Sequence, residues 1–151
     1  NNLASNIGGY QGIDFDKFYP DFSKNVIMSM PTKIMGEELI VKSWINLNYK
    51  GNFNIKHQHF NQSIILSGVY YFKVHQKGGK IIFHDPRTPL IRSGQDFQIF
   101  GDANDFNGNF HVKPKDDMII FFPSWFEHSV QSSLSDEPRI SIAFNIMSSY
   151  K

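Results

Sequence analysis

Three histidines in two separate stretches of the sequence are the residues best suited to bind a metal ion. His57 and His59 stand two positions apart in NIKHQHF, and His128 lies far downstream in FPSWFEHSV. In an extended segment, residues two positions apart project from the same face, and histidine is the commonest metal ligand. A lone H-x-H motif is a weak signal, and clustering at a loop tip is the structural alternative. The prediction of a metal site therefore depends on the third histidine, His128.

The stretch RISIAFNIM, residues 139–147, alternates with a period of two. One face is apolar, with Ile140, Ile142, Phe144 and Ile146. The other face carries Arg139, Ser141, Ala143 and Asn145. Small side chains beside a fixed cation leave room for an anion inside a barrel. The alternative is an edge strand with a polar outer face and a surface arginine.

Composition limits the classes of protein and of site. The chain has 151 residues, of which 40% are hydrophobic and 19% charged, and its formal net charge is +1. These values are typical of one globular domain, and the net charge gives no indication of nucleic-acid binding. The absence of cysteine excludes disulfides, thiolate ligands and a thiol nucleophile. Any metal must be held by histidine and oxygen ligands.

The sequence indicates a location in the cytoplasm and leaves the oligomeric state open. No apolar stretch reaches the roughly 20 residues that span a bilayer. The first residues lack the basic start and apolar block of a signal peptide. The first residue is Asn1 rather than methionine, which suggests that a segment precedes it.

Short strands separated by turn residues are the elements expected to position these side chains. Residues 1–12 are polar and glycine-rich, and residues 14–30 suggest a short helix that is interrupted at Pro20. Strands are expected from residue 38 to 48, from 64 to 74 and from 80 to 84, the last two paired as a hairpin across the turn at 76–79. Further strands are expected at 96–100, 109–113, 118–122, 128–132 and 139–147, the run at 118–122 being covered on both faces.

About eight such strands with little helix predict an all-β fold, a double-sheet jelly roll of the cupin-like, double-stranded β-helix type. Its core is expected over residues 38–148 of a single domain spanning 1–151, with an N-terminal arm and short helix over 1–37. Because a barrel mouth is a common ligand site, the histidines and Arg139 are expected to converge there.

The order of motifs resembles the 2-oxoglutarate/Fe(II)-dependent oxygenase superfamily. The motifs are H-x-H, a strand with a double tyrosine, GGKIIFHDPR, FPSWFEHSV and RISIAFN, over roughly residues 40 to 147. The chain is most similar to a group of small members found in phages and marine bacteria, in which a segment like SNIGGYQG lies upstream. The resemblance implies a double-stranded β-helix that binds one Fe(II), with 2-oxoglutarate chelating the metal and O2 entering an open coordination position.

The resemblance also implies roles for individual residues. His57, His59 and His128 would be the metal ligands, and Arg139 would hold the remote carboxylate of 2-oxoglutarate, because a guanidinium matches a carboxylate. Ser141 and Tyr71 would donate hydroxyl groups to the same carboxylate.

One position departs from the usual pattern of the superfamily. His59 stands where most members carry Asp or Glu, so the 2-His-1-carboxylate triad is incomplete, and three imidazoles also suit zinc. Asp85 is a weaker alternative ligand, better explained by a turn and a pair with Arg87, and a set using His59 and Asn61 ranks lower.

Four further residues are candidates for lining the pocket: Trp44, Asn46, Trp125 and Asn145. For each tryptophan a core role is the alternative, and Asn145 is expected to orient cosubstrate or water. The remaining histidines, His75, His84 and His111, are interpreted as structural or surface residues.

The predicted function is that of a hydroxylase that couples decarboxylation of 2-oxoglutarate, to succinate and CO2, with oxidation of a substrate C–H bond. One alternative is a cupin-like metal enzyme without 2-oxoglutarate, against which Arg139 and Ser141 argue. Another is a non-catalytic jelly roll that binds a sugar or belongs to a virion. The sequence does not name the substrate, whose selection is expected in the N-terminal arm and the loop at 101–108.

Overall fold

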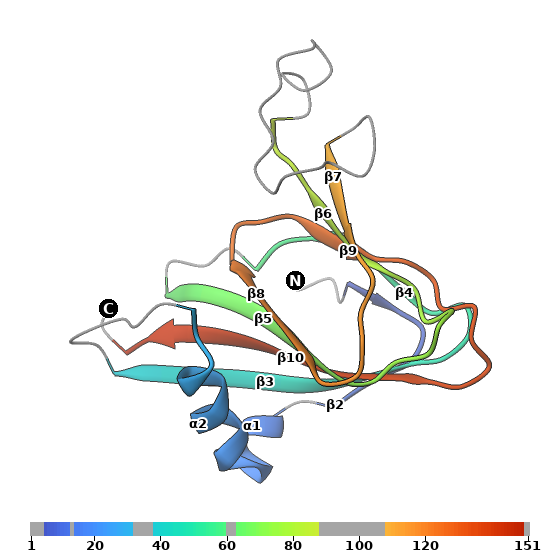
Figure 1. Cartoon of the computed structure of the whole chain (residues 1–151). Coiled ribbons are helices and arrows are strands. Elements are labelled where there is room, and N and C mark those ends of the chain that lie inside the picture. The colour runs from blue at the N-terminus through green and yellow to red at the C-terminus, as the bar shows by residue number, and fades with distance from the viewer. Residues whose placement is uncertain (1–4, 13, 32–37, 60–62, 88–107, 150–151) are drawn as a thin grey trace.

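The strands of the described residues form two antiparallel five-stranded sheets (Figure 1). Because most of the strands alternate in sequence, each can bury one face against the other sheet. The computed structural model describes residues 5–12, 14–31, 38–59, 63–87 and 108–149. Sheet A has the order β1 (Asn6–Ile7), β4 (Phe53–His57), β9 (His128–Val130), β6 (Ile81–His84), β7 (Asn109–Val112). Sheet B has the order β2 (Tyr10–Gly12), β3 (Leu39–Asn48), β10 (Arg139–Ser148), β5 (Ile64–Lys73), β8 (Met118–Pro123).

The topology confirms the predicted jelly roll. From β3 to β10 the chain passes repeatedly between the sheets, so that β3, β5, β8 and β10 lie in sheet B while β4, β6, β7 and β9 lie in sheet A. Each sheet thereby buries its inner face against the other, which is the double-stranded β-helix architecture.

Two short helices cover the outer face of sheet B. They are α1 (Phe15–Phe18) and α2 (Pro20–Met28), and both contact β3 (Figure 1). The predicted interruption at Pro20 is confirmed, because this residue is the first of α2, where its missing N–H leaves no hydrogen bond unmade. No helix among the described residues is both long and apolar enough to cross a bilayer.

The hydrophobic core has two layers, and β10 contributes to both sides of sheet B. Between the sheets lie Val69, Tyr71, Ile81, Phe83, Phe122 and Phe126. Between sheet B and α2 lie Val26, Val41, Phe144 and Ile146. The apolar face of β10 therefore contacts the helices, and its Arg139 face is turned toward the interior of the sandwich. β10 lies between β3 and β5, so it is not the edge strand of the alternative interpretation.

The strand β8 is covered on both faces, as its continuous apolar sequence predicts. Met118 and Ile120 pack against the core between the sheets, whereas Ile119 and Phe121 pack against the layer beneath α2. The predicted strands at 109–113 and 128–132 are also present, as β7 and the three-residue β9. The predicted strand at 96–100 and all but the last residue of the 101–108 loop lie outside the described residues.

The prediction that residues 64–74 and 80–84 form a hairpin is wrong. β5 lies in sheet B, whereas β6 lies in sheet A and pairs with β7 and β9. The turn itself is present, with the Gly78 N–H donating to the His75 carbonyl at 2.8 Å. Crossing to the other sheet lets Ile81 and Phe83 cover the core face of sheet B, which a hairpin in the same sheet would leave open.

The N-terminal arm joins the two sheets at one side of the sandwich. β1 pairs with β4 in sheet A and β2 pairs with β3 in sheet B. Between them, Gly8 and Gly9 have φ values of 73° and 74°, in the left-handed region that favours glycine. A Cβ at Gly9 would also clash with the Leu47 carbonyl oxygen, so this crossing requires glycine.

Candidate metal centre

The three predicted histidines come together at one end of sheet A. His57 ends β4 and His128 begins β9, and the two are cross-strand neighbours. His59 follows two residues after β4, and its backbone N–H donates to the Ser124 carbonyl at 2.9 Å, which fixes it beside them. One ring nitrogen of each histidine lies within 4.8 Å of those of the other two.

Hydrogen bonds orient all three imidazoles in the same sense. Nδ1 of His57 lies 2.8 Å from the Ile55 carbonyl oxygen, and Nδ1 of His128 lies 3.0 Å from that of Phe126. Since a carbonyl oxygen can only accept, both Nδ1 atoms carry the proton. Nε2 is then left with its lone pair free for a metal.

Nδ1 of His59 also faces a hydrogen-bond acceptor, which here belongs to a side chain instead of the backbone. Its Nδ1 lies 2.8 Å from Asn145 Oδ1, which also accepts from the Ser67 hydroxyl at 2.8 Å. The acceptor on Nδ1 fixes the tautomer and the ring orientation, as second-sphere partners of metal ligands do. Asn145 therefore contacts a candidate ligand, and it is not among the residues that line the cavity.

Burial keeps the cluster neutral. It lowers the pKa of His57 and of His59 from the ordinary value, and it lowers the pKa of His128 to about 3, with the neighbouring His57 adding to the effect. Neutral imidazole is the form that binds a metal. The cluster is thus prepared to bind a cation near neutral pH.

The candidate ligand set in the described part of the chain is made of nitrogen alone, since no carboxylate joins the three histidines. Asp85 instead accepts from Arg87, at 3.1 Å from Nε and 3.0 Å from Nη2, as its turn sequence predicts. Asn61 lies outside the described residues.

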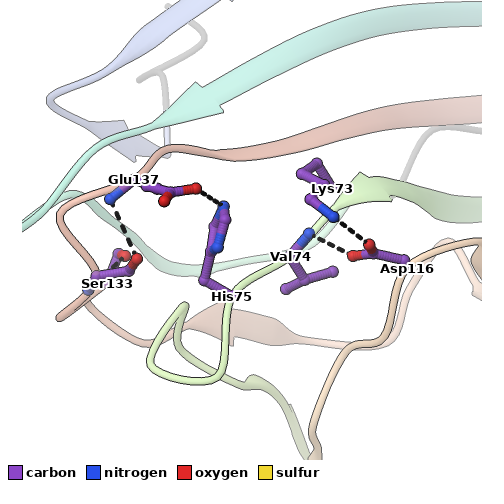
Figure 2. A network of polar contacts seen from close by, with 7 residues as sticks. Lys73, Val74, His75, Asp116, Ser133 and Glu137 are labelled. Carbon is purple, nitrogen blue, oxygen red and sulfur yellow. Dashed lines mark hydrogen bonds and ion pairs between the residues drawn. The ribbon is translucent and has the colours of Figure 1, made fainter.

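None of the other histidines among the described residues joins the cluster. His75 lies 3.2 Å from Glu137 in a surface network of polar contacts (Figure 2). His84 bridges Asn109 and Ser129, at 2.9 Å from each. His111 lies on β7 opposite Ile82.

Arg139 is the second chemical feature of the interior. Only 2% of this residue is exposed, and its Nη1 donates to the Gly78 carbonyl at 2.6 Å. Its Nε is buried without a hydrogen-bond partner in the described part of the chain. Burial lowers the pKa of Arg139 and raises that of the adjacent Tyr71 to about 12, so the phenol stays protonated. A buried cation that lacks an anion is costly, and this arrangement therefore calls for an anionic ligand.

The histidine cluster and Arg139 open into one cavity between the sheets. It has a volume of about 580 Å³, including its open mouth, and the predicted Ser141, Tyr71, Trp44 and Asn46 also line it. Trp125 does not; it is 48% exposed and packs against Phe126.

Sequence reasoning missed four polar lining residues: Ser5, Gln11, Asn48 and Asn54. Asn48 could have been found, because it lies two positions after Asn46 on the same face of one strand. The others depend on how the arm and β4 pair.

These residues fit an Fe(II) centre with a bound 2-oxoacid. Three neutral imidazoles whose nitrogens lie close together would hold the metal and leave positions for other ligands. The unpaired guanidinium N–H on the same cavity suits a carboxylate held at a distance from the metal. The same cavity is thus lined by candidate ligands for the metal and by a candidate partner for the carboxylate.

Comparison with known proteins agrees with this geometry. A family model described as "Putative 2OG-Fe(II) oxygenase" matches residues 42–145, more than half of the chain. A search of curated proteins found no match.

Solved structures share the fold at low sequence identity. The prolyl-4-hydroxylase of Pseudomonas putida is 15% identical, with 92% of this chain and 72% of that chain covered and a TM-score of 0.59. HygX of Streptomyces hygroscopicus, solved with nickel and 2-oxoglutarate bound, is 11% identical, with 94% and 70% covered and a TM-score of 0.62. An oxidoreductase of the 2OG-Fe(II) oxygenase family from Burkholderia pseudomallei is 16% identical, with 75% covered and a TM-score of 0.56.

The chain spans 47% of the length of the Burkholderia enzyme. These structures show the double-stranded β-helix, and the family model extends over both histidine stretches and the arginine strand. The chain therefore belongs to the 2-oxoglutarate/Fe(II)-dependent oxygenase family.

Proposed function

We propose that this protein hydroxylates a substrate with Fe(II) held by His57, His59 and His128 and with 2-oxoglutarate anchored by Arg139. The observation that carries the proposal is a buried arginine whose Nε has no partner among the described residues. It lies in the same cavity as three imidazoles that use Nδ1 for hydrogen bonds and have no described partner at Nε2. A cupin-like enzyme without 2-oxoglutarate would leave that buried cation without an anion.

Ser141 and Tyr71 complete the proposed carboxylate site. They are cross-strand neighbours on β10 and β5, and both line the cavity with Arg139. Tyr71 is 2% exposed, and the pKa of about 12 keeps its hydroxyl a donor. A guanidinium with two hydroxyl donors satisfies several lone pairs of a carboxylate, which a buried ion pair requires.

Bound Fe(II) and 2-oxoglutarate would together supply the oxidising chemistry, in which O2 yields one oxygen to succinate and one to the hydroxylated product as CO2 is released. The chain's own residues would hold the metal through the neutral histidines and the cosubstrate through Arg139. Val69, Ile81 and Phe122 line the same cavity and keep part of it apolar, which limits access of water.

His59 in place of a carboxylate gives the metal no negative protein ligand. The dianionic cosubstrate would then contribute the negative charge at the centre. Because three imidazoles also suit zinc, the identity of the metal is part of the experimental test.

Two finer assignments rest on the motifs. The order of H-x-H, the double tyrosine and RISIAFN supports placing the protein with the small members found in phages and marine bacteria. Such a protein would act in the cytoplasm of a bacterium, as a single domain whose core spans residues 38–148.

The test is anaerobic calorimetry of 2-oxoglutarate with the metal-stripped protein, with and without Fe(II) or Zn(II), on the wild type and on Arg139→Met. Truncating one partner of a buried charge pair costs about 2–5 kcal/mol, so binding should weaken at least 30-fold in the variant. Arg87→Ala is the matched control, because Arg87 pairs with Asp85 and does not line the cavity.

Binding that requires metal and is lost only in Arg139→Met would support the proposal. If 2-oxoglutarate fails to bind even with Fe(II) present, the cosubstrate assignment is wrong. A metal enzyme without 2-oxoglutarate, or a jelly-roll binding protein, would then be the better interpretation.

A further inference from the structure

Carboxamide side chains line the cavity on the side of the N-terminal arm. Four residues form this amide wall: Gln11, Asn46, Asn48 and Asn54. Gln11 comes from β2 and Asn46 and Asn48 from β3, all in sheet B, whereas Asn54 comes from β4 in sheet A. The amide wall thus contains residues from both sheets, on the side of the sandwich where the arm pairs with β3 and β4.

The arm supplies the outermost residue of the wall. Gln11 is exposed on β2, and its cross-strand neighbour is the buried Asn46. The arm precedes the region matched by the family model, which begins at residue 42. Gln11 therefore lies outside the region that the family model matches.

Hydrogen bonds hold the amides in defined orientations. Gln11 Nε2 donates to Asn46 Oδ1 at 3.0 Å, and Asn48 Nδ2 donates to Asn6 Oδ1 at 3.0 Å. Within the described residues, Gln11 Oε1 and Asn46 Nδ2 have no protein partner. Two residues that line the cavity thus keep one acceptor and one donor without a partner among the described residues.

This pair lies close to the metal centre. Trp44 is two residues before Asn46 on the same face of β3, and its ring centroid lies 5.7 Å from that of His59. A molecule bonded to Gln11 and Asn46 can thus extend past Trp44 toward the metal. Arg139 and Ser141, the cross-strand neighbours of Asn48 and Asn46 on β10, remain for the cosubstrate.

The charge of the cavity restricts what can bind there. Among the described lining residues there is no aspartate, glutamate or lysine, and Arg139 is the one permanent cation. With Arg139 occupied by 2-oxoglutarate, the described lining residues offer no permanently charged partner for a second charge. Desolvating an unpaired charge is costly, so a neutral substrate is favoured.

We propose that Gln11 and Asn46 select the second substrate, and that this substrate is a neutral molecule with adjacent hydrogen-bond donor and acceptor groups. A carboxamide and a pair of neighbouring hydroxyls share this chemistry. The inference rests on the proposed function for the position of the cosubstrate, while the donor and acceptor pair is a property of the cavity itself.

The test is ligand-observed NMR on the protein loaded with Zn(II), which has no redox chemistry, and 2-oxoglutarate. The probes are N-acetylglycinamide, its anionic and cationic counterparts N-acetylglycine and glycinamide, and methyl glucopyranoside. Both neutral probes should bind more tightly than either charged one. Whether N-acetylglycinamide or methyl glucopyranoside binds more tightly distinguishes an amide substrate from a hydroxyl substrate.

The variant Gln11→Ala should weaken binding of the neutral probes about 2- to 10-fold, the effect of one lost hydrogen bond. Because Gln11 is exposed, its replacement leaves the core intact, and affinity for 2-oxoglutarate should not change. Gln76→Ala is the matched control, since Gln76 is an exposed glutamine in the turn after β5 and does not line this cavity.

The inference would be overturned by a charged probe that binds as tightly as the neutral ones, by neutral probes that do not bind, or by unchanged probe binding in Gln11→Ala. Loss of 2-oxoglutarate affinity in Gln11→Ala would also overturn it, because the wall would then belong to the cosubstrate site. The two neutral probes are also measured without metal and cosubstrate, because the Gln11 and Asn46 pair does not depend on Arg139. Failure of the wild type to bind 2-oxoglutarate would therefore count against the proposed function alone.

Discussion

At the scale of the residue, the metal centre depends on which nitrogen of each histidine carries the proton. Two of the three acceptors are backbone carbonyls two residues before the histidine, those of Ile55 and Phe126. The third is the side chain of Asn145, which lies on β10 in the opposite sheet. His59 is thus the proposed ligand whose orientation depends on a side chain that mutation can remove.

Replacing Asn145 by alanine should lower metal affinity about 10- to 100-fold, the usual effect of losing a second-sphere partner. His59 would lose the acceptor that fixes its tautomer, while the nitrogen ligands themselves remain. Competition with a chromophoric chelator under anaerobic conditions measures the affinity.

Two variants control this experiment. Asn145→Asp keeps an acceptor for His59 and should retain metal binding. Ser67→Ala removes the other donor to Asn145 and leaves the His59 contact in place. Unchanged affinity in Asn145→Ala would show that His59 is oriented without this bond, or that it is not a ligand.

At the scale of the element, β10 is the strand that serves both the core and the site. Its apolar face is completely buried at Phe144 and Ile146, each 0% exposed, and its other face carries Arg139 and Ser141 into the cavity. The Phe144 ring is accommodated by Gly68, its cross-strand neighbour on β5. A Cβ at Gly68 would clash with that ring and lie 2.6 Å from the Ile120 carbonyl oxygen.

Gly68→Ala should therefore destabilise the fold by about 1–3 kcal/mol through overpacking. In the double variant with Phe144→Leu, part of the clash is relieved, so the loss should be smaller than the sum of the single losses. Urea denaturation of the four proteins measures the coupling. Simple additivity would mean that the backbone at Ile120, rather than the ring, limits the space.

At the scale of the whole molecule, the proposed ligands connect the two sheets. His57 and His128 belong to sheet A, and Arg139 belongs to sheet B. A 2-oxoglutarate molecule that chelates the metal and bonds to Arg139 would link the sheets across the cavity. Ligands that bind only the folded state raise its stability by mass action.

Thermal unfolding should show this link directly. Fe(II) or Zn(II) should raise the midpoint temperature of unfolding, and 2-oxoglutarate alone should have little effect on it. Metal and 2-oxoglutarate together should raise the midpoint more than the metal alone. At a ligand concentration 100 times its Kd, binding of each ligand should raise the free energy of unfolding by about 2.7 kcal/mol. A chelator should reverse both steps, and Arg139→Met should respond to metal but not to 2-oxoglutarate. Stabilisation by 2-oxoglutarate in the presence of chelator would contradict the proposed chelation.

Much of this molecule follows from the sequence by itself. The period of two in RISIAFNIM separates the apolar face of β10 from the face of Arg139, because successive side chains of a strand point to opposite sides. The spacing of His57 and His59, with a third histidine at the start of another strand, is sufficient to predict a metal site. The strand-length apolar run at 118–122 likewise predicts a strand covered on both faces.

Only the tertiary structure shows which strands pair and which residues far apart in the sequence contact each other. Alternation tells which face of a strand is buried but not which strand lies beside it, so the pairing of β6 with β7 and β9, in place of β5, could not be read from the turn at 76–79. Asn145 has the same pattern position as the cavity residues of β10, but its Oδ1 lies 2.8 Å from His59 Nδ1, on the segment that follows β4. Gln11 enters the cavity only because the arm crosses from one sheet to the other. Such contacts depend on the packing of distant segments, and no local pattern encodes them.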